Sequence, residues 1–347
     1  MAIMAMNTPN RDISIDFIKG IAILNVIIIH TVWWSGDFYI NRYSILRQAP
    51  LLFDVFVFFI VAGMLSTIKQ RMTLTGLISK LSKQYIIYLI VILIWIIIAK
   101  LSSVALDPIE ILEAFSLFLF TNSPGVEGLA STIWFMKIYF IIQIIIYCLQ
   151  KVKMKSIILT ITVAITYLFH FFSSTTTSYD AISSKVNVIS FYYSLVVIGQ
   201  IIQSKTIILK KNIIVLVVLL LFLISIAILF GVNDIQTEKF PPSLLYFTIC
   251  LPAIGFIFIM KNSAYVVNIR EQKIYKLITW AGKNSIYLFY AQSFSGSLIT
   301  YNIGGLARVL NNNLITILLV SLLINFSLSI LGAFILKVIV TRTFIAK

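Results

Sequence analysis

Charged residues are scarce in this chain: 11% of its 347 residues are Asp, Glu, Lys or Arg, whereas 60% are hydrophobic. Soluble globular domains are about half apolar and about a quarter charged, so the composition excludes a soluble domain. The apolar runs are about twenty residues long and lack the period-two alternation of membrane strands, which favours helices over a barrel. We therefore expect an all-α polytopic membrane protein.

Cysteine and acidic residues are also few. The two cysteines, Cys148 and Cys250, both fall inside apolar runs, which excludes a disulfide framework and a CxxC metal motif, and we expect no metal site. The 27 basic residues outnumber the 12 acidic ones and give a formal net charge of +15. Because they are spread over short connections, membrane topology explains them better than a nucleic-acid partner does. We expect no cleavable signal peptide.

Ten apolar runs predict ten transmembrane helices in one domain that covers residues 1–347. The expected spans are 15–34, 50–68, 85–101, 132–149, 157–172, 188–202, 213–230, 244–260, 278–299 and 314–340. Residues 35–47 are expected to form a polar connection, and 69–83 a basic, partly amphipathic link. With a cytoplasmic N-terminus most basic residues fall on the cytoplasmic side, so the positive-inside rule places both termini in the cytoplasm.

The first apolar run carries an acid, a base and an imidazole on one face. Eleven residues separate Lys19 from His30 and fourteen separate Asp16 from His30. At about 100° per residue, the three side chains lie within about 40° of one helical stripe. Ionisable groups inside a span are costly and usually mark function, although Asp16 and Lys19 near the helix end equally fit surface anchors. We interpret the stripe as the wall of a path through the membrane.

This layout matches the needs of an enzyme that moves an acyl group across a membrane. Coenzyme A has charged phosphates at one end and a thioester at the tip of a long arm, and the rise from Lys19 to His30 is about 16 Å. Lys19 would hold phosphate, and His30 would take the proton from an acceptor hydroxyl. A covalent acyl-imidazole on His30 fits the residues equally well.

Four segments resemble motifs of one family. Residues 16–30 (DFIK, ten residues, H) are similar to the pattern Asp-x-x-(Arg/Lys)-x10-His in the first helix of the acyltransferase 3 family of integral membrane O-acyltransferases. Residues 58–63 (FFIVAG) resemble its Phe-Phe-x-x-Ser-Gly segment, and 133–136 (IWFM) its Leu-Trp-Phe-Leu. Residues 282–290 (GKNSIYLFY) resemble its late Gly-x-x-Ser-x-x-Tyr-Leu-x-His run.

The chain departs from these motifs at three positions. Lys19 stands where the family more often has Arg, Ala62 stands where it usually has Ser, and Tyr290 stands where it has the late His. A hydroxyl role at position 62 and an essential second histidine are therefore not expected.

The resemblance implies a fold of about ten helices, acetyl-coenzyme A as the cytoplasmic donor and a location in the bacterial cytoplasmic (inner) membrane. It implies as acceptor a sugar hydroxyl of a cell-surface polysaccharide, such as O-antigen, capsule or exopolysaccharide, or of its undecaprenyl-linked precursor. No fused extracytoplasmic domain is expected, as in the short branch related to fucose 4-O-acetylases and polysaccharide O-acetyltransferases. The donor-binding candidates are Asp16, Lys19, Phe58, Phe59, Gly63, Trp134, Phe135, Lys283, Ser285 and Tyr287.

Besides His30, Asp54 is the second catalytic candidate. It lies about as deep in its span as His30 and would hold the imidazole tautomer and stabilise its cation, unless it is an interfacial acid. Lys137 either stabilises an oxyanion or extends toward the membrane surface. Trp134 and Phe135 either wall the acyl path or belong to an aromatic belt.

Two other function classes fit parts of the pattern. A transporter or flippase for a lipid-linked glycan would use His30, Asp16 and Asp54 as a proton relay. Such a relay does not require the single stripe that includes Lys19, and no pair of matching broken helices is evident in the sequence. A structural partner in a glycan-assembly complex is the third interpretation.

Overall fold

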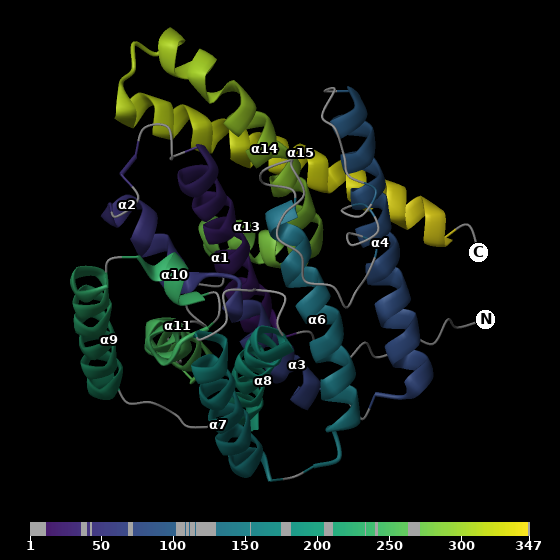
Figure 1. The fold of residues 1–347 in the computed structure, drawn as a ribbon, viewed down its shortest axis with the longest axis vertical. Helices are drawn as coiled ribbons and strands as arrows, with labels where there is room; N and C mark the ends of the chain where they lie inside the picture. Colours follow the sequence, from purple (N-terminus) through teal and green to yellow (C-terminus); the bar gives the residue numbers. More distant parts are fainter. Residues whose placement is uncertain are drawn as a thin grey trace.

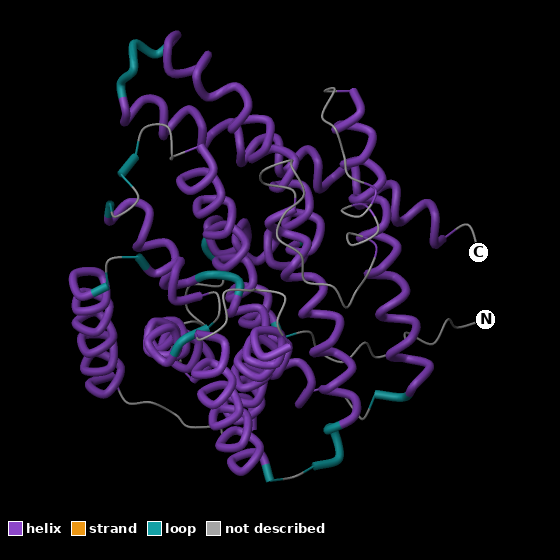
Figure 2. Tube along the Cα trace, viewed as in Figure 1, coloured by secondary structure: helices purple, strands orange, loops and turns teal. Residues whose placement is uncertain are grey.

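The described part of the computed structural model consists of helices joined by loops and turns, and no strand occurs there (Figures 1 and 2). The described residues are 12–35, 40–41, 44–68, 72–101, 108, 111, 115, 130–152, 154–174, 182–204, 211–232, 234–239, 242–262 and 271–345. The predicted all-α class is confirmed. The acidic residues between the third and fourth expected spans, such as Glu110 and Glu127, lie outside the described residues.

The helices of the described part have the following order along the chain. They are α1 (Ile13–His30), η1 (Thr31–Ser35), α2 (Ile45–Gln48), η3 (Ala49–Phe53), α3 (Phe56–Ile68), α4 (Leu74–Leu101), α6 (Ala130–Cys148), α7 (Lys155–Ser174), α8 (Ile182–Ser204), α9 (Lys211–Gly231), α10 (Ile235–Lys239), α11 (Leu244–Asn262), α13 (Lys273–Lys283), α14 (Ser285–Val309) and α15 (Leu314–Ile345). η1 is a π-helical turn and η3 a 3₁₀ turn.

Within the described residues, six helical segments are long and apolar enough to cross a membrane. These are Ile13–Trp33, Ile45–Ile68, Leu74–Ile97, Ser183–Ser204, Leu244–Asn262 and Leu314–Arg342. Three shorter apolar helices, Trp134–Cys148, Lys155–Phe171 and Leu216–Gly231, coincide with further expected spans. The chain is thus a multi-pass membrane protein, and the count of ten spans stays a prediction.

Two expected spans are interrupted in the structure. The run 50–68 is divided because Pro50 lies in the first turn of η3 and the Asp54 carboxylate accepts the Val55 N–H at 2.6 Å, which ends that turn before α3 begins. The run 278–299 is divided at Asn284, whose amide donates to the Trp280 carbonyl and accepts from Lys337 of α15 at 3.0 Å. In both places a short polar side chain satisfies backbone groups that a continuous helix would use.

Two connections also differ from their prediction. The helix α4 begins at Leu74, so most of the link 69–83 extends the third expected span. Arg47, expected in a polar connection, lies in α2 and is 1% exposed. Its guanidinium stacks on the Trp33 ring at 4.1 Å and donates to the carbonyls of Trp33 and Ile40. The arginine is buried because aromatic stacking and backbone acceptors replace its hydration.

Glycines set the closest helix contacts. A Cβ on Gly282 of α13 would lie 1.7 Å from the Asp16 carbonyl oxygen of α1, and one on Gly20 would lie 1.9 Å from the Ile278 carbonyl oxygen. Gly63 of α3 and Gly199 of α8 meet the facing backbone in the same way. Small residues let membrane helices approach until their backbones touch, so these positions fix how α1 packs on α13 and α3 on α8.

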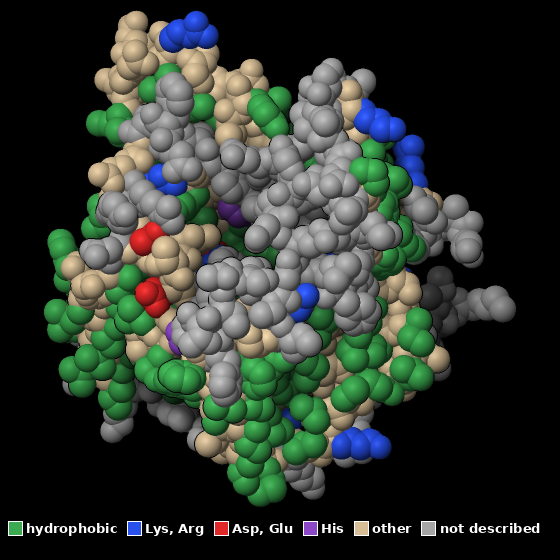
Figure 3. All heavy atoms as spheres, in the orientation of Figure 1, with side chains coloured by type: hydrophobic (Ala, Val, Ile, Leu, Met, Phe, Trp, Pro, Cys, Tyr) green, Lys and Arg blue, Asp and Glu red, His purple; other side chains and the backbone are tan. Residues whose placement is uncertain are grey.

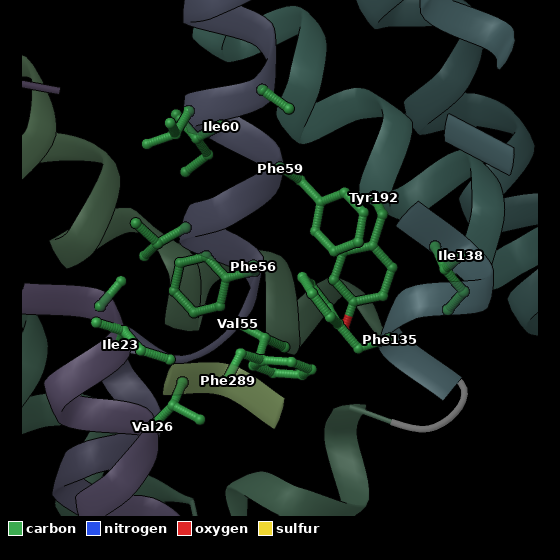
Figure 4. Close-up of a cluster of buried hydrophobic side chains, with 14 of the residues drawn as sticks. Ile23, Val26, Val55, Phe56, Phe59, Ile60, Phe135, Ile138, Tyr192 and Phe289 are labelled. Atoms are coloured by element: carbon green, nitrogen blue, oxygen red, sulfur yellow. The ribbon is translucent and has the colours of Figure 1, made fainter. Parts of the chain in front are cut away.

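An aromatic cluster joins several of these helices at the centre of the molecule. Figure 4 shows Phe59, Phe135, Tyr192 and Phe289 gathered together. The ring centroids of Phe59 and Tyr192 are 4.5 Å apart, and those of Phe135 and Phe289 are 4.8 Å apart. Ring pairs at such distances favour packing beyond the area they bury, so the cluster holds α3, α6, α8 and α14 together.

Candidate active site

His30 ends α1 and forms a hydrogen bond with a residue that the sequence motifs do not include. Its Nδ1 meets the side-chain oxygen Oε1 of Gln292, which is fully buried on α14. The amide nitrogen of Gln292 donates to the Phe289 carbonyl at 3.0 Å. Figure 3 shows histidine atoms within a hollow of the molecular face seen in Figure 1.

This pair of contacts fixes the tautomer of the histidine. A carbonyl oxygen only accepts, so the amide group facing Phe289 must be the NH₂ of Gln292, and the group facing His30 must be its oxygen. Nδ1 therefore donates, and in the neutral ring Nε2 then carries the lone pair. A histidine that acts as a general base needs such a ring nitrogen with a free lone pair.

The residue after His30 anchors the same end of α1 to α15. Asn325, fully buried, donates to the Thr31 hydroxyl at 2.7 Å, and Ser295 of α14 donates to the Asn325 side-chain oxygen. Ser295 and Ser329 are a further 2.9 Å pair. These bonds tie α1, α14 and α15 together one turn from His30 and limit its freedom to move.

Asp54 lies in a buried ion pair with Lys239. The two side chains are 3% and 7% exposed, and they join the start of α3 to the end of α10. Lys239 also lies 5.1 Å from the centre of the Trp134 ring. The negative charge of Asp54 and the positive charge of Lys239 have opposite electrostatic effects on the His30 ring. The hydrogen bond to the ring, for which Asp54 was the candidate, is made by Gln292. The burial of Asp54 does not match an interfacial acid.

The opposite end of α1 is basic. Lys19 pairs with Asp16 at 2.8 Å, and the Asp16 side chain is 3% exposed. Lys19 and Lys283 each adjoin one of the two glycines at which α1 and α13 meet, Gly20 and Gly282. The close contact of the two backbones therefore brings both lysines to one place.

A cavity of about 250 Å³ has both lysines on its wall. Five of the donor-binding candidates line it: Lys19, Phe58, Phe135, Lys283 and Ser285. Phe289 lines it too, and its carbonyl holds Gln292. Ala62, which replaces the usual serine, also lies on its wall and makes that wall apolar. The cavity thus extends from the two lysines to Phe289, and His30 itself is not among the residues that line it.

The other five donor-binding candidates lie outside the cavity wall. Asp16 pairs with Lys19, Trp134 stacks near Lys239, and Phe59 is fully buried in the aromatic cluster. Gly63 faces the backbone of Val196 in α8, and Tyr287 is half-buried beside the core. Gly63 and Phe59 therefore shape the helix packing around the cavity.

Two further residues lie deeper than their sequence context indicates. Lys137 is 1% exposed, so it does not extend toward the membrane surface. Tyr290, at the position of the family's late histidine, is 2% exposed, and its hydroxyl has no hydrogen-bond partner within the described residues.

A comparison with known families agrees with this geometry. The family model described as an acyltransferase domain, that of acyltransferase 3, matches residues 12–339. The chain belongs to the acyltransferase 3 family. Neither a curated protein nor a solved structure matches it significantly. The motif resemblance is confirmed, and the protein is a membrane acyltransferase.

The sequence motifs of this acyltransferase did not lead to Gln292 and Lys239. Gln292 lies in the run 278–299, two residues beyond the last motif position, and its polar side chain in an expected span was the available signal. Lys239 belongs to no motif and is one of many basic residues between apolar runs, so the sequence offers no sign of its pairing with Asp54.

Proposed function

We propose that this acyltransferase transfers an acetyl group from cytoplasmic acetyl-coenzyme A to a sugar hydroxyl of a cell-surface polysaccharide or its lipid-linked precursor, with His30 as general base. The observation that carries the proposal is the single cavity that has Lys19 and Lys283 on its wall together with Phe289, next to the turn that fixes the His30 tautomer. A transporter does not require this arrangement.

The two lysines would bind the phosphates of the donor as point charges. Small-molecule pockets usually measure about 300–1,000 Å³, so a cavity of about 250 Å³ fits a narrow thioester arm and leaves the nucleotide outside. The rings of Phe58, Phe135 and Phe289 would line the path of the arm.

Near the thioester, Nε2 of His30 would take the proton from the acceptor hydroxyl while the hydroxyl oxygen attacks the thioester carbonyl carbon. The carbon–sulfur bond then breaks, and the thiolate leaves with the proton returned by the imidazolium. Throughout, the Gln292 oxygen accepts from Nδ1–H and keeps the ring in one orientation. Such a positioned base contributes about 10²–10⁴-fold to the rate.

Transfer of radiolabelled acetyl from acetyl-coenzyme A to membrane glycan tests the proposal. We expect labelled glycan with the wild type and almost none with His30→Ala at matched expression. His170→Ala is the matched control because His170, the second of the chain's two histidines, lies on α7 beside a different cavity. If His30→Ala labels the glycan as strongly as the wild type does, His30 is not the general base. If the wild type labels no glycan, the assignment of donor and acceptor is wrong.

A further inference from the structure

Gln84 of α4 places an unsatisfied oxygen at the donor cavity. Its side chain lines the cavity, and its Oε1 atom is buried without a hydrogen-bond partner in the described structure. Leu65, Ala62 and Met136, which also line the cavity, are apolar. Buried polar atoms are almost always paired in native proteins, and a lone one bears the full cost of its desolvation.

We propose that Gln84 binds an amide of the donor's pantetheine arm, an inference that rests on the proposed function. The arm is an aliphatic chain interrupted by two secondary amides, each with one N–H donor and one carbonyl acceptor. A glutamine side chain presents the complementary pair, an oxygen that accepts and an NH₂ that donates. The Gln84 oxygen accepts the N–H of one arm amide and thereby gains the partner that it lacks.

The position of Gln84 agrees with this role. Lys19 and Lys283 on the same cavity wall are suited to the phosphates, and Phe289 marks the end toward His30. The pantetheine amides lie between the phosphates and the thioester in the donor, so a residue that reads them belongs on the wall of the cavity itself. Gln84 supplies specificity for the arm, since the apolar side chains around it do not distinguish an amide from a hydrocarbon.

The inference predicts how the protein distinguishes coenzyme A from a close analogue. In the analogue, one arm amide is replaced by an ester, so an oxygen stands where the N–H was. The Gln84 oxygen would then face another acceptor, and a site built around a hydrogen bond rejects a ligand that lacks it. We expect the wild type to bind one of the two ester analogues, one for each amide, about tenfold more weakly than coenzyme A.

Calorimetric titration of the purified full-length protein with coenzyme A and with both analogues tests this. The Gln84→Leu variant should bind coenzyme A about tenfold more weakly than the wild type and should bind the critical analogue with the same affinity as coenzyme A. Gln200→Leu is the matched control. Gln200 also has a buried side-chain oxygen without a partner in the described structure, but it lies on α8 away from this cavity wall. It should retain the wild-type discrimination.

The outcomes separate this inference from the proposed function. Full discrimination in Gln84→Leu, or equal binding of all three ligands by the wild type, would overturn the role of Gln84 and leave the donor assignment intact. If the wild type binds no coenzyme A, the donor assignment itself fails. If Gln84→Leu does not fold, Gln84→Met, which keeps the length of the side chain, takes its place. Equal binding of coenzyme A and the critical analogue by this variant supports the role of Gln84, and wild-type discrimination between them contradicts it.

Discussion

The Nδ1 atom of His30 and the Oε1 atom of Gln292 join the end of α1 to the middle of α14. Toward the other end of α1, the helix α13, which directly precedes α14, packs on α1 at Gly20 and Gly282. Along α1 the chain therefore passes from Lys19, on the cavity wall, to His30, which forms a hydrogen bond with Gln292 of α14. In the proposed function, donor binding and proton transfer therefore both use residues of α1.

Loss of the Gln292 amide should slow the chemical step without affecting donor binding. In Gln292→Leu the His30 ring loses the acceptor that fixes its tautomer and orientation, and misplacement of a catalytic group by about 1 Å costs about 10²-fold. We expect kcat to fall by about 10–100-fold while KM for acetyl-coenzyme A stays near the wild-type value. Ser297→Ala is the control, because the Ser297 hydroxyl donates to the Ser293 carbonyl of its own helix. Wild-type kcat in Gln292→Leu would contradict this role.

Lys283 should act on the phosphates of the donor and on nothing else. In Lys283→Gln we expect KM for acetyl-coenzyme A to rise about tenfold, as for the loss of one hydrogen bond to a charged group. With acetyl-pantetheine, which lacks the nucleotide phosphates, the variant and the wild type should behave alike. Lys276→Gln serves for comparison because Lys276 lies on the same helix but is exposed and paired with Glu271. An equal effect on both donors would show that Lys283 does not bind phosphate.

The sequence predicted the residues of the stripe in α1 but not the partners that determine their chemistry. Helical periodicity sufficed to place Asp16, Lys19 and His30 on one face, because i to i+11 spacing is a local property of a helix. The pairs His30–Gln292 and Asp54–Lys239 span 262 and 185 residues. Such pairs depend on how the helices pack, which apolar runs do not specify.

The same limit explains the interrupted helices. The run 278–299 is expected from the sequence to form one span. The break at Asn284 depends on a bond to Lys337 of α15, which lies 53 residues away. Gly63 likewise belongs to a motif that resembled a binding segment, yet its lack of a side chain serves the packing of α3 on α8. The motifs lead to the correct family, and tertiary packing determines which of their residues reach the cavity wall.

Substitution of Gly282 should separate α1 from α13. The added Cβ of Gly282→Ala would lie 1.7 Å from the Asp16 carbonyl oxygen, so the helices must move apart. Overpacking of this kind costs about 1–3 kcal/mol, which should lower the melting temperature in detergent. Gly305→Ala is the matched control on α14: nothing lies within 4 Å of its Cβ, and alanine favours a helix over glycine by up to about 1 kcal/mol. Equal stability of the two variants would contradict the close contact.

The Asp54–Lys239 pair should be more important for stability than for catalysis. Removal of one partner from a buried ion pair leaves an uncompensated charge and costs about 3–5 kcal/mol. We therefore expect Asp54→Leu and Lys239→Met each to lower the melting temperature strongly. The double variant should lose less stability than the two single variants together, because it leaves no unpaired buried charge. Residues in contact typically differ from additivity by about 0.5–3 kcal/mol.

The double variant also decides whether Asp54 assists His30. Gln292 remains in place to hold the imidazole, and the opposing charges of Asp54 and Lys239 are removed together, so their combined effect on the ring should be small. We expect acetyl transfer within about tenfold of the wild type, in contrast to the loss of about 10²-fold or more in His30→Ala. A folded double variant as inactive as His30→Ala would instead make the Asp54 carboxylate part of the catalytic machinery, as the position of Asp54 in its span first indicated.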